Sequence, residues 1–140
     1  MIFVIYGEES FLMEQKLQAL KKEYNCSEEM MNLSTYRGDE DSIESVYEDL
    51  ITPPFFTDKK MIVLKNLYFL TTKKLKKDNS EIEYFEKCLD NDSKEVIFVI
   101  YHVGKDFDER KKIVKRLRKE AKFFEIDKVN HYKLSDSTRQ

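Results

Sequence analysis

Short apolar runs alternate along this chain with longer stretches in which apolar residues recur at every third or fourth position. The short runs are rich in β-branched and aromatic residues, which is typical of strands that are buried on both faces of a sheet. Continuous burial of this kind favours a parallel sheet. The pattern predicts strands at Ile2–Tyr6, Met31–Tyr36, Met61–Asn66, Val96–His102 and Phe123–Ile126.

The longer stretches predict amphipathic helices between these strands. In the first of them, Met13, Leu17 and Leu20 share one face among Glu, Gln and Lys residues. In the second, an Asp or Ser side chain is placed to cap the first turn. The pattern predicts helices at about Glu9–Tyr24, Asp41–Leu50, Ser80–Leu89 and Asp106–Ala121.

The alternation of strand and helix, with short connections, defines the expected fold class. It is a three-layer α/β domain with a mainly parallel five-stranded sheet and helices on both faces. At 140 residues the chain suits one domain, which we expect to span residues 1–140. The polar tail at residues 133–140 is where a further domain would be attached, so we expect the chain to be a fragment of a longer protein.

The composition is that of a folded protein in water, with 41% apolar residues, 37% charged residues and a mean hydropathy of -0.63. The opening apolar run reaches Glu8 and Glu9 within a few residues, so we expect no secretory signal, no membrane span and a cytoplasmic protein. Cys26 and Cys88 are far apart and belong to no Cys-x-x-Cys or Cys/His cluster, which favours free thiols. We therefore expect no metal and no cofactor.

Charge is distributed unevenly along the chain. Residues 1–58 contain 4 Lys and Arg against 13 Asp and Glu, whereas residues 59–140 contain 21 against 14. This asymmetry predicts an acidic side and a basic side, which suits a subunit of an assembly or one edge of a nucleic-acid channel. The basic residues of the last predicted helix suit contacts to DNA phosphates, although a solvated helix face has the same composition. The candidates are Arg110, Lys111, Lys115 and Arg118.

The turn after the first strand, where an open parallel α/β sheet binds its ligand, lacks the residues of a phosphate loop. The pattern G-x-x-x-x-G-K-[ST] would place a glycine, a lysine and a hydroxyl in the turn that begins at Gly7. Leu12, Met13 and Glu14 stand at these positions instead. The third strand runs into Lys65, where an ATPase of this architecture would have acidic residues for magnesium. We therefore expect no catalytic residues in this domain.

The segment Ile51–Lys60 carries the only two prolines of the chain, directly before two phenylalanines. Pro53 and Pro54 restrict φ and lack N–H donors, so they end the preceding helix and stiffen the segment. Phe55 and Phe56 then lie on a connection. Two aromatic side chains there either pack under the sheet or form an exposed contact surface, and the residues alone leave both alternatives open.

Three stretches of the chain together resemble the delta subunit of the bacterial DNA polymerase III clamp loader. They are FVIYGEESFLMEQKLQAL, LITPPFFTDKKMIVLKN and VIFVIYHVGKDFDERKKIVKRLRKEAKFFEI, of which the first two are the more specific. The resemblance implies an N-terminal AAA+-like domain of the P-loop NTPase type without a functional P-loop. It also implies that the lid and collar domains of the family are absent from this chain.

In this family the domain binds and opens the ring-shaped beta sliding clamp during DNA replication, by inserting two adjacent hydrophobic side chains. The resemblance assigns that role to Phe55 and Phe56, with Pro53 and Pro54 beside them. It implies no ATPase activity of the domain itself, within a holoenzyme that is a DNA-directed DNA polymerase, a nucleotidyltransferase. Further implied partners are the gamma/tau and delta prime subunits, through regions largely absent here, and DNA within the assembly, but no membrane.

Two alternatives from other functional classes stay open. A small phosphotransferase or nucleotide-binding α/β domain would use a degenerate phosphate loop around Gly7. A nucleic-acid-binding module would use the basic last helix, and its affinity would fall steeply with added salt. The first alternative predicts binding of ATP with magnesium, and the second predicts binding of DNA by this domain alone.

Overall fold

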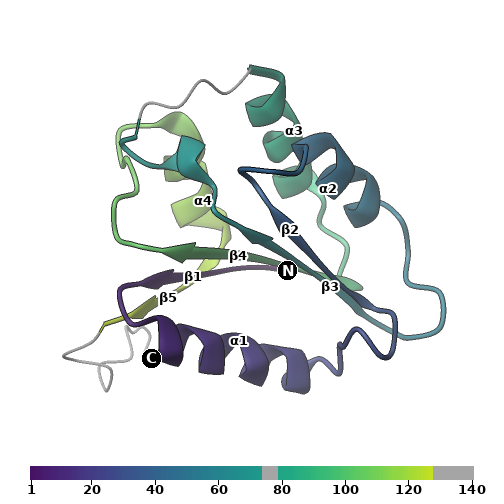
Figure 1. The fold of residues 1–140 in the computed structure, drawn as a ribbon. Coiled ribbons are helices and arrows are strands. Elements are labelled where there is room, and N and C mark those ends of the chain that lie inside the picture. The colour runs from purple at the N-terminus through teal and green to yellow at the C-terminus, as the bar shows by residue number, and fades with distance from the viewer. Residues whose placement is uncertain (74–78, 128–140) are drawn as a thin grey trace.

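The computed structural model of the protein describes residues 1–73 and 79–127, which form three layers (Figure 1). A five-stranded sheet is covered on one face by α1 and on the other by α2, α3 and α4. The strands are β1 (Ile2–Gly7), β2 (Leu33–Arg37), β3 (Lys60–Lys65), β4 (Val96–Val103) and β5 (Lys122–Ile126). The helices are α1 (Ser10–Glu23), α2 (Ile43–Leu50), α3 (Asn79–Asp90), α4 (Lys112–Glu120) and the short 3-10 helix η1 (Tyr68–Leu70).

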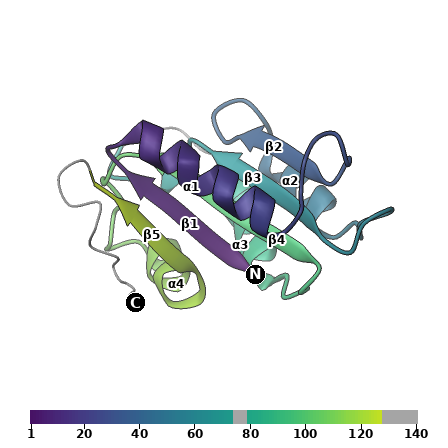
Figure 2. The ribbon, with the colours of Figure 1, turned by 90° about the horizontal axis from the view of Figure 1, so that it is seen from below.

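All neighbouring strands of the sheet are parallel, in the order β2-β3-β4-β1-β5. The register pairs Val4 with Ile100 between β1 and β4, and Ile62 with Phe98 between β3 and β4. Seen from below, α1 lies in front of the sheet, alongside β1 (Figure 2). The arrangement confirms the predicted three-layer α/β fold with a parallel five-stranded sheet.

Each face of the sheet has its own hydrophobic core. Val4 and Tyr6 of β1 belong to the core under α2, α3 and α4, whereas Phe3 and Ile5 belong to the core under α1. The predicted apolar face of α1 is buried against the second of these cores. Because helices cover both faces, successive residues of a central strand are all apolar, and this is the pattern from which the strands were predicted.

The last helix is shorter than the prediction, because it begins at Lys112 rather than at Asp106. The backbone of the intervening segment pairs with the chain that follows η1. The N–H group of Thr72 donates to the carbonyl of Asp106 over 3.1 Å, and Phe107 forms an isolated antiparallel bridge with Thr71. An extended bridge of this kind is incompatible with helical backbone, so Phe107 reaches the core from a loop.

The second strand also begins later than predicted, at Leu33 instead of Met31. Met31 has a left-handed backbone, with φ of 59°, and its side chain is 80% exposed. The next residue, Asn32, is buried, and its amide group donates to the carbonyls of Asn25 and Lys59 over 3.1 and 2.9 Å. These hydrogen bonds end the turn at Asn32 and leave Met31 outside the sheet.

Candidate protein-binding surface

The segment that carries the two phenylalanines connects α2 to β3 and is named here the aromatic loop, residues 51–59. It lies at the amino-terminal end of β3, at the opposite end of the sheet from the turn between β1 and α1 (Figure 1). Phe55 and Phe56 are each 85% exposed. The alternative that these side chains pack under the sheet is therefore wrong.

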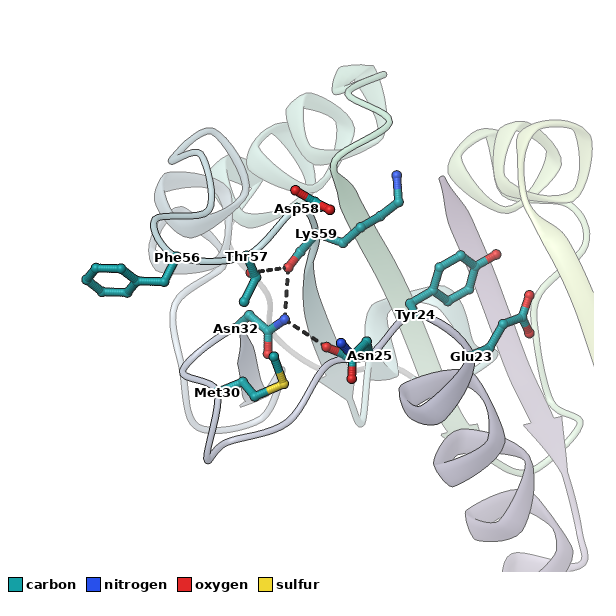
Figure 3. Close-up of a pocket in the computed structure, with 9 residues that line it drawn as sticks. All are labelled: Glu23, Tyr24, Asn25, Met30, Asn32, Phe56, Thr57, Asp58 and Lys59. Carbon is teal, nitrogen blue, oxygen red and sulfur yellow. Dashed lines mark hydrogen bonds between the residues drawn. The ribbon is translucent and has the colours of Figure 1, made fainter.

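The two aromatic rings form an exposed pair at the tip of the loop. Their centroids lie 6.2 Å apart and their planes are inclined by 42°. In the close-up, the ring of Phe56 points away from the body of the domain (Figure 3). Burying a side chain of this size contributes about 2–3 kcal/mol, which the folded domain alone does not gain from Phe55 or Phe56. Such a pair is typical of a surface that is completed by a partner.

Helix α2 ends, and its last turn is capped, before the two prolines. The helix ends at Leu50, and the hydroxyl of Thr52 donates to the carbonyl of Glu48 over 2.7 Å. Pro53 is exposed and Pro54 is half-buried. Since neither residue has an N–H group to donate and each has a restricted φ, the loop has few alternative conformations and a low entropic cost of ordering on binding.

Lys60, the first residue of β3, is a buried lysine that holds the base of the aromatic loop. Its ammonium group donates to the carbonyls of Asp49 and Thr52 over 2.7 and 2.9 Å, and lies 2.6 Å from Oδ1 of Asp49. The hydroxyl of Tyr36 donates to the other carboxylate oxygen of Asp49 over 2.7 Å. The positive charge at these carbonyls also complements the carboxyl end of α2.

These contacts and partial burial set the pKa values of Asp49 and Tyr36. Burial by itself raises the pKa of Asp49, but hydrogen bonds from Lys60 and Tyr36 outweigh it and hold the pKa below its usual value. Burial and the neighbouring carboxylate both raise the pKa of Tyr36, so its hydroxyl stays a donor at neutral pH. Asp49 is thus ionised and Lys60 has a charged partner.

The other end of the loop is held from two further elements. The side chain of Asn32 and the hydroxyl of Thr57 both donate to the carbonyl of Lys59, over 2.9 and 2.7 Å (Figure 3). The ammonium group of Lys59 donates to the carbonyl of Lys94 over 3.0 Å. The exposed aromatic pair therefore stands on a base that is hydrogen-bonded to the α1–β2 and α3–β4 connections.

A cleft of about 410 Å³ adjoins the aromatic loop (Figure 3). It lies between the end of α1, the α1–β2 connection and the residues that lead into β3. The residues that line it are Glu23, Tyr24, Asn25, Met30, Asn32, Phe56, Thr57, Asp58 and Lys59. Sequence reasoning missed this cleft, because its walls are brought together only by the sheet pairing of β2 with β3.

Two of the basic residues that were predicted on the last helix lie before it. Arg110 precedes α4 and Lys111 is its N-cap. The guanidinium group of Arg110 contacts the buried carboxylate of Asp108 at 3.0 Å, and the ammonium group of Lys111 donates to the carbonyl of Phe69 over 2.8 Å. These contacts hold the segment in its non-helical conformation, which accounts for the difference from the prediction.

The other two basic residues lie on α4 as predicted. Arg118 forms an ion pair with Glu109 at 2.7 Å, donates to the hydroxyl of Tyr6 over 3.3 Å and lies 4.3 Å from the ring centre of Phe123. Lys115 is exposed and has no ion pair among the described residues. Three of the four predicted cations thus bind groups of the domain itself.

The turn between β1 and α1 is closed by the end of β5. A Cβ atom on Gly7, whose φ is 144°, would lie 1.9 Å from the carbonyl oxygen of Ile126. The N–H group of Glu8 donates to that same carbonyl over 3.1 Å. Met13, at the position of the phosphate-loop lysine, is fully buried under the sheet. Gly7 therefore serves a close approach between two strands.

Other candidate chemical groups are accounted for by packing. Nε2 of His102 in β4 lies 2.7 Å from Oδ1 of Asp106, and Cys26 and Cys88 are free, buried thiols. Burial raises the pKa of Cys88 to about 12. Within residues 1–73 and 79–127, no group of three or more His, Cys, Asp or Glu side chains is arranged to hold a metal ion. In the same residues, no helix is both long and apolar enough to cross a membrane.

The fold places the chain among three-layer α/β domains with a parallel sheet, here with a first turn closed by β5 and an exposed aromatic pair at the opposite end. The chain belongs to the family of DNA polymerase III delta subunits, since the sequence model of that family matches residues 3–127. The resemblance seen in the sequence is confirmed.

A curated sequence and a solved structure, both from Bacillus subtilis, support this assignment. The DNA polymerase III subunit delta of strain 168 is 28% identical over 139 residues, which are 98% of this chain and 40% of that protein. The solved structure of the DNA clamp loader delta protein (YqeN) is similar with a TM-score of 0.79 and 28% identity, over 98% of this chain and 41% of the other. The chain thus spans about two fifths of the length of these relatives, and its polar tail lies outside the described residues.

Proposed function

We propose that this chain is the part of a clamp-loader delta subunit that binds the beta sliding clamp and helps to open it. Phe55 and Phe56 enter an apolar pocket of the clamp, and Pro53 and Pro54 hold them in the conformation that enters. The observation that carries the proposal is the 85% exposure of both rings on a hydrogen-bonded base, in a chain of the delta family.

The exposure and the order of the aromatic loop suit an anchor, a side-chain pair that contributes much of the free energy of binding. A few buried aromatic side chains dominate the free energy of most protein interfaces. Two phenylalanines at about 2–3 kcal/mol each contribute about 4–6 kcal/mol, which is less than the roughly 8 kcal/mol of micromolar binding, so other contacts must add to theirs. A loop that is already ordered by Lys60 and Asn32 loses little further entropy on binding.

The clamp ring would open because this domain binds its open state more tightly than its closed state. A ligand shifts an equilibrium between a closed and an open ring only by the difference between its affinities for the two states. In the proposed mechanism the aromatic pair fits the open conformation better, so its binding free energy favours opening. No ATPase activity of this domain is required, and the ATP-dependent steps belong to other subunits of the assembly.

The remaining partners follow from the same assignment. The gamma/tau and delta prime subunits would contact the part of a delta subunit that lies beyond this domain. DNA would be met only within the assembled loader, in the cytoplasm. The engagement of Arg110, Lys111 and Arg118 with groups of the domain itself is consistent with a minor role of this surface in DNA binding.

Replacing both phenylalanines tests the proposal directly. The variant Phe55→Ala/Phe56→Ala should bind the sliding clamp of the same organism at least tenfold more weakly, about 1.4 kcal/mol, in surface plasmon resonance or calorimetry. Since both side chains are exposed, the free energy of unfolding should change by no more than about 0.5 kcal/mol for each. Loss of binding with retained stability separates a contact from a structural defect.

Phe11 provides the matched control. It is 67% exposed and lies in the first turn of α1, at the other end of the sheet from the aromatic loop (Figure 1). Phe11→Ala removes the same side chain and should leave clamp affinity unchanged. Equal affinity of the double variant and the unmodified chain would show that the aromatic pair does not make the contact.

A further inference from the structure

A second exposed apolar group lies beside the aromatic loop. Met30 and Met31, in the connection from α1 to β2, are 40% and 80% exposed. Met30 and Phe56 line the same cleft (Figure 3). We name residues 27–32 the methionine turn. The two segments thus place four exposed apolar side chains at the same end of the sheet, and Met30 and Phe56 meet at one cleft.

The methionine turn is well ordered by its own hydrogen bonds. The N–H group of Ser27 donates to the side-chain oxygen of Asn32 over 2.9 Å, and the hydroxyl of Ser27 accepts from the N–H group of Met30 over 3.1 Å. The N–H group of Met31 donates to the carbonyl of Glu28 over 3.0 Å. The turn therefore presents its methionines in a defined position.

Met31 is poorly suited to its own backbone conformation. Its φ of 59° lies in the left-handed region of backbone conformations. Glycine and asparagine adopt this conformation readily, whereas methionine has no side-chain group that stabilises it. The side chain is 80% exposed, so packing within the domain does not account for it either. An exposed apolar side chain held in this conformation beside the aromatic loop suits a contact with another molecule.

The methionine turn and the aromatic loop share one base. The amide group of Asn32 donates to the carbonyl of Lys59, which also accepts from Thr57. The carbonyl of Asn32 accepts from the N–H group of Met61 in β3 over 2.8 Å. A molecule that contacts both segments therefore meets a single rigid surface.

The size of the aromatic pair leaves room for a second contact. A specific interface of standard size buries about 800 Å² of each partner, and one aromatic side chain contributes about 150–250 Å². Phe55 and Phe56 thus provide about 300–500 Å², which is less than two thirds of such an interface. Met30 of the methionine turn is an exposed apolar side chain that lines the same cleft as Phe56.

We propose that Met30 and Met31 are a second anchor for the same sliding clamp that binds Phe55 and Phe56, and that the cleft lined by Met30 and Phe56 holds a projecting segment of the clamp. This inference rests on the proposed function. Glu23 and Asp58 are exposed carboxylates at the cleft and outnumber the one lysine that lines it, Lys59, so we expect the segment that enters it to carry lysine or arginine.

The substitution Met31→Asn tests the second anchor without straining the fold. Asparagine adopts the left-handed conformation more readily than methionine, so the variant should unfold at the same temperature as the unmodified chain or above it. The affinity of the 140-residue chain for the purified sliding clamp should fall about three- to tenfold. Phe11→Ala again serves as the control for an exposed apolar residue at a distance.

The cleft has a test of its own. Asp58→Asn removes one exposed carboxylate and should weaken clamp binding at low ionic strength, with a smaller effect as salt is added, because exposed charges are screened. An effect that is absent at every salt concentration would overturn the assignment of a basic segment to the cleft.

The outcomes separate this inference from the proposed function. Loss of binding in Phe55→Ala/Phe56→Ala together with normal binding of Met31→Asn would overturn the second anchor and leave the proposed function in place. Normal binding of the double variant, or no clamp binding by the unmodified chain, would overturn both. Self-association of the chain that Met31→Asn abolishes would assign the methionine turn to a second copy and overturn the clamp contact.

Discussion

The ammonium group of Lys60 lies among the carbonyl oxygens of Asp49 and Thr52 and one carboxylate oxygen of Asp49. A buried charge is tolerated only where it is paired and hydrogen-bonded, and this site meets both conditions. The side chain joins the end of α2 to the start of β3, which are the two ends of the aromatic loop. At the scale of a residue, the exposed aromatic pair therefore depends on a buried lysine.

Lys60→Met should destabilise the domain and loosen the loop. The substitution keeps most of the apolar volume but leaves the carboxylate of Asp49 without its cation and removes the ammonium donor from the carbonyls of Asp49 and Thr52, at a cost of about 2–3 kcal/mol. Urea unfolding at pH 7 measures this cost. Clamp affinity should fall as well, because the loop would then have to be ordered on binding.

Lys59→Met is the control for this variant. The ammonium group of Lys59 makes one exposed hydrogen bond, to the carbonyl of Lys94, so its loss should change stability by less than about 1 kcal/mol.

The destabilisation caused by Lys60→Met should also become smaller in acid. The pKa of Asp49 is lowered in the folded state, so its stabilising contribution is present above the ordinary carboxyl pKa and is lost as the pH falls through the folded value. Equal stability of the two variants at pH 7 would contradict the role assigned to Lys60.

At the scale of the element, the strands and the alternation of the fold were predictable, because a sheet covered on both faces requires apolar residues throughout its central strands. The predicted starts of α4 and β2 were wrong, because contacts with distant parts of the chain determine the backbone there. Phe107 has the apolar spacing of a helix, yet its backbone pairs with Thr71. Met31 continues an alternating pattern, yet the buried amide of Asn32 ends the turn there.

The candidate surface was predictable only in part. Pro53 to Phe56 mark the loop in the sequence, because prolines exclude regular structure. The residues alone did not predict whether the rings of Phe55 and Phe56 are exposed, since a loop has no periodicity that distinguishes inward from outward side chains. The hydrogen bonds that hold the loop could not be predicted either, because they join residues far apart in the sequence. Lys60 binds Asp49, 11 positions before it, and Asn32 binds Lys59, 27 positions after it.

The contact between β1 and β5 depends on the absence of a side chain at Gly7. Gly7→Ala would place Cβ at 1.9 Å from the carbonyl oxygen of Ile126 and impose a φ of 144° on an L-residue. We expect a loss of about 3 kcal/mol or more, since both an overlap with backbone and a strained conformation must be relieved. Thermal unfolding followed by circular dichroism measures the loss.

Gly104→Ala is the comparison for Gly7→Ala. Its backbone has a similar φ of 137°, but the nearest atom to an added Cβ is a carboxylate oxygen of Asp106, at 3.0 Å. A side chain can shift where a strand backbone cannot, so this substitution should cost less. If Gly104→Ala were the more destabilising of the two, the close approach of β5 would not be what requires glycine at position 7.

At the scale of the whole molecule, the two ends of the sheet differ in character. The amino-terminal ends of β2 and β3 carry the methionine turn and the aromatic loop, with exposed apolar side chains on an ordered base. At the carboxyl-terminal end of β1, where sheets of this kind usually bind their ligand, the backbone is hydrogen-bonded to β5. The turn after β1 is thus joined to β5, and the opposite edge presents the proposed contact surface.

This asymmetry predicts that the domain does not bind ATP with magnesium. A phosphate would need free N–H groups in the turn after β1, but that of Glu8 donates to Ile126. Met13 is buried where a lysine would reach the phosphates, and the carboxylate of Glu14, at the position of the hydroxyl, accepts from Tyr101 over 3.2 Å. Isothermal titration should give no heat of binding, and the melting temperature should not rise with added nucleotide. A P-loop ATPase titrated in the same buffer is the positive control. Saturable binding at micromolar to millimolar ATP would reveal a nucleotide site and contradict a purely protein-binding domain.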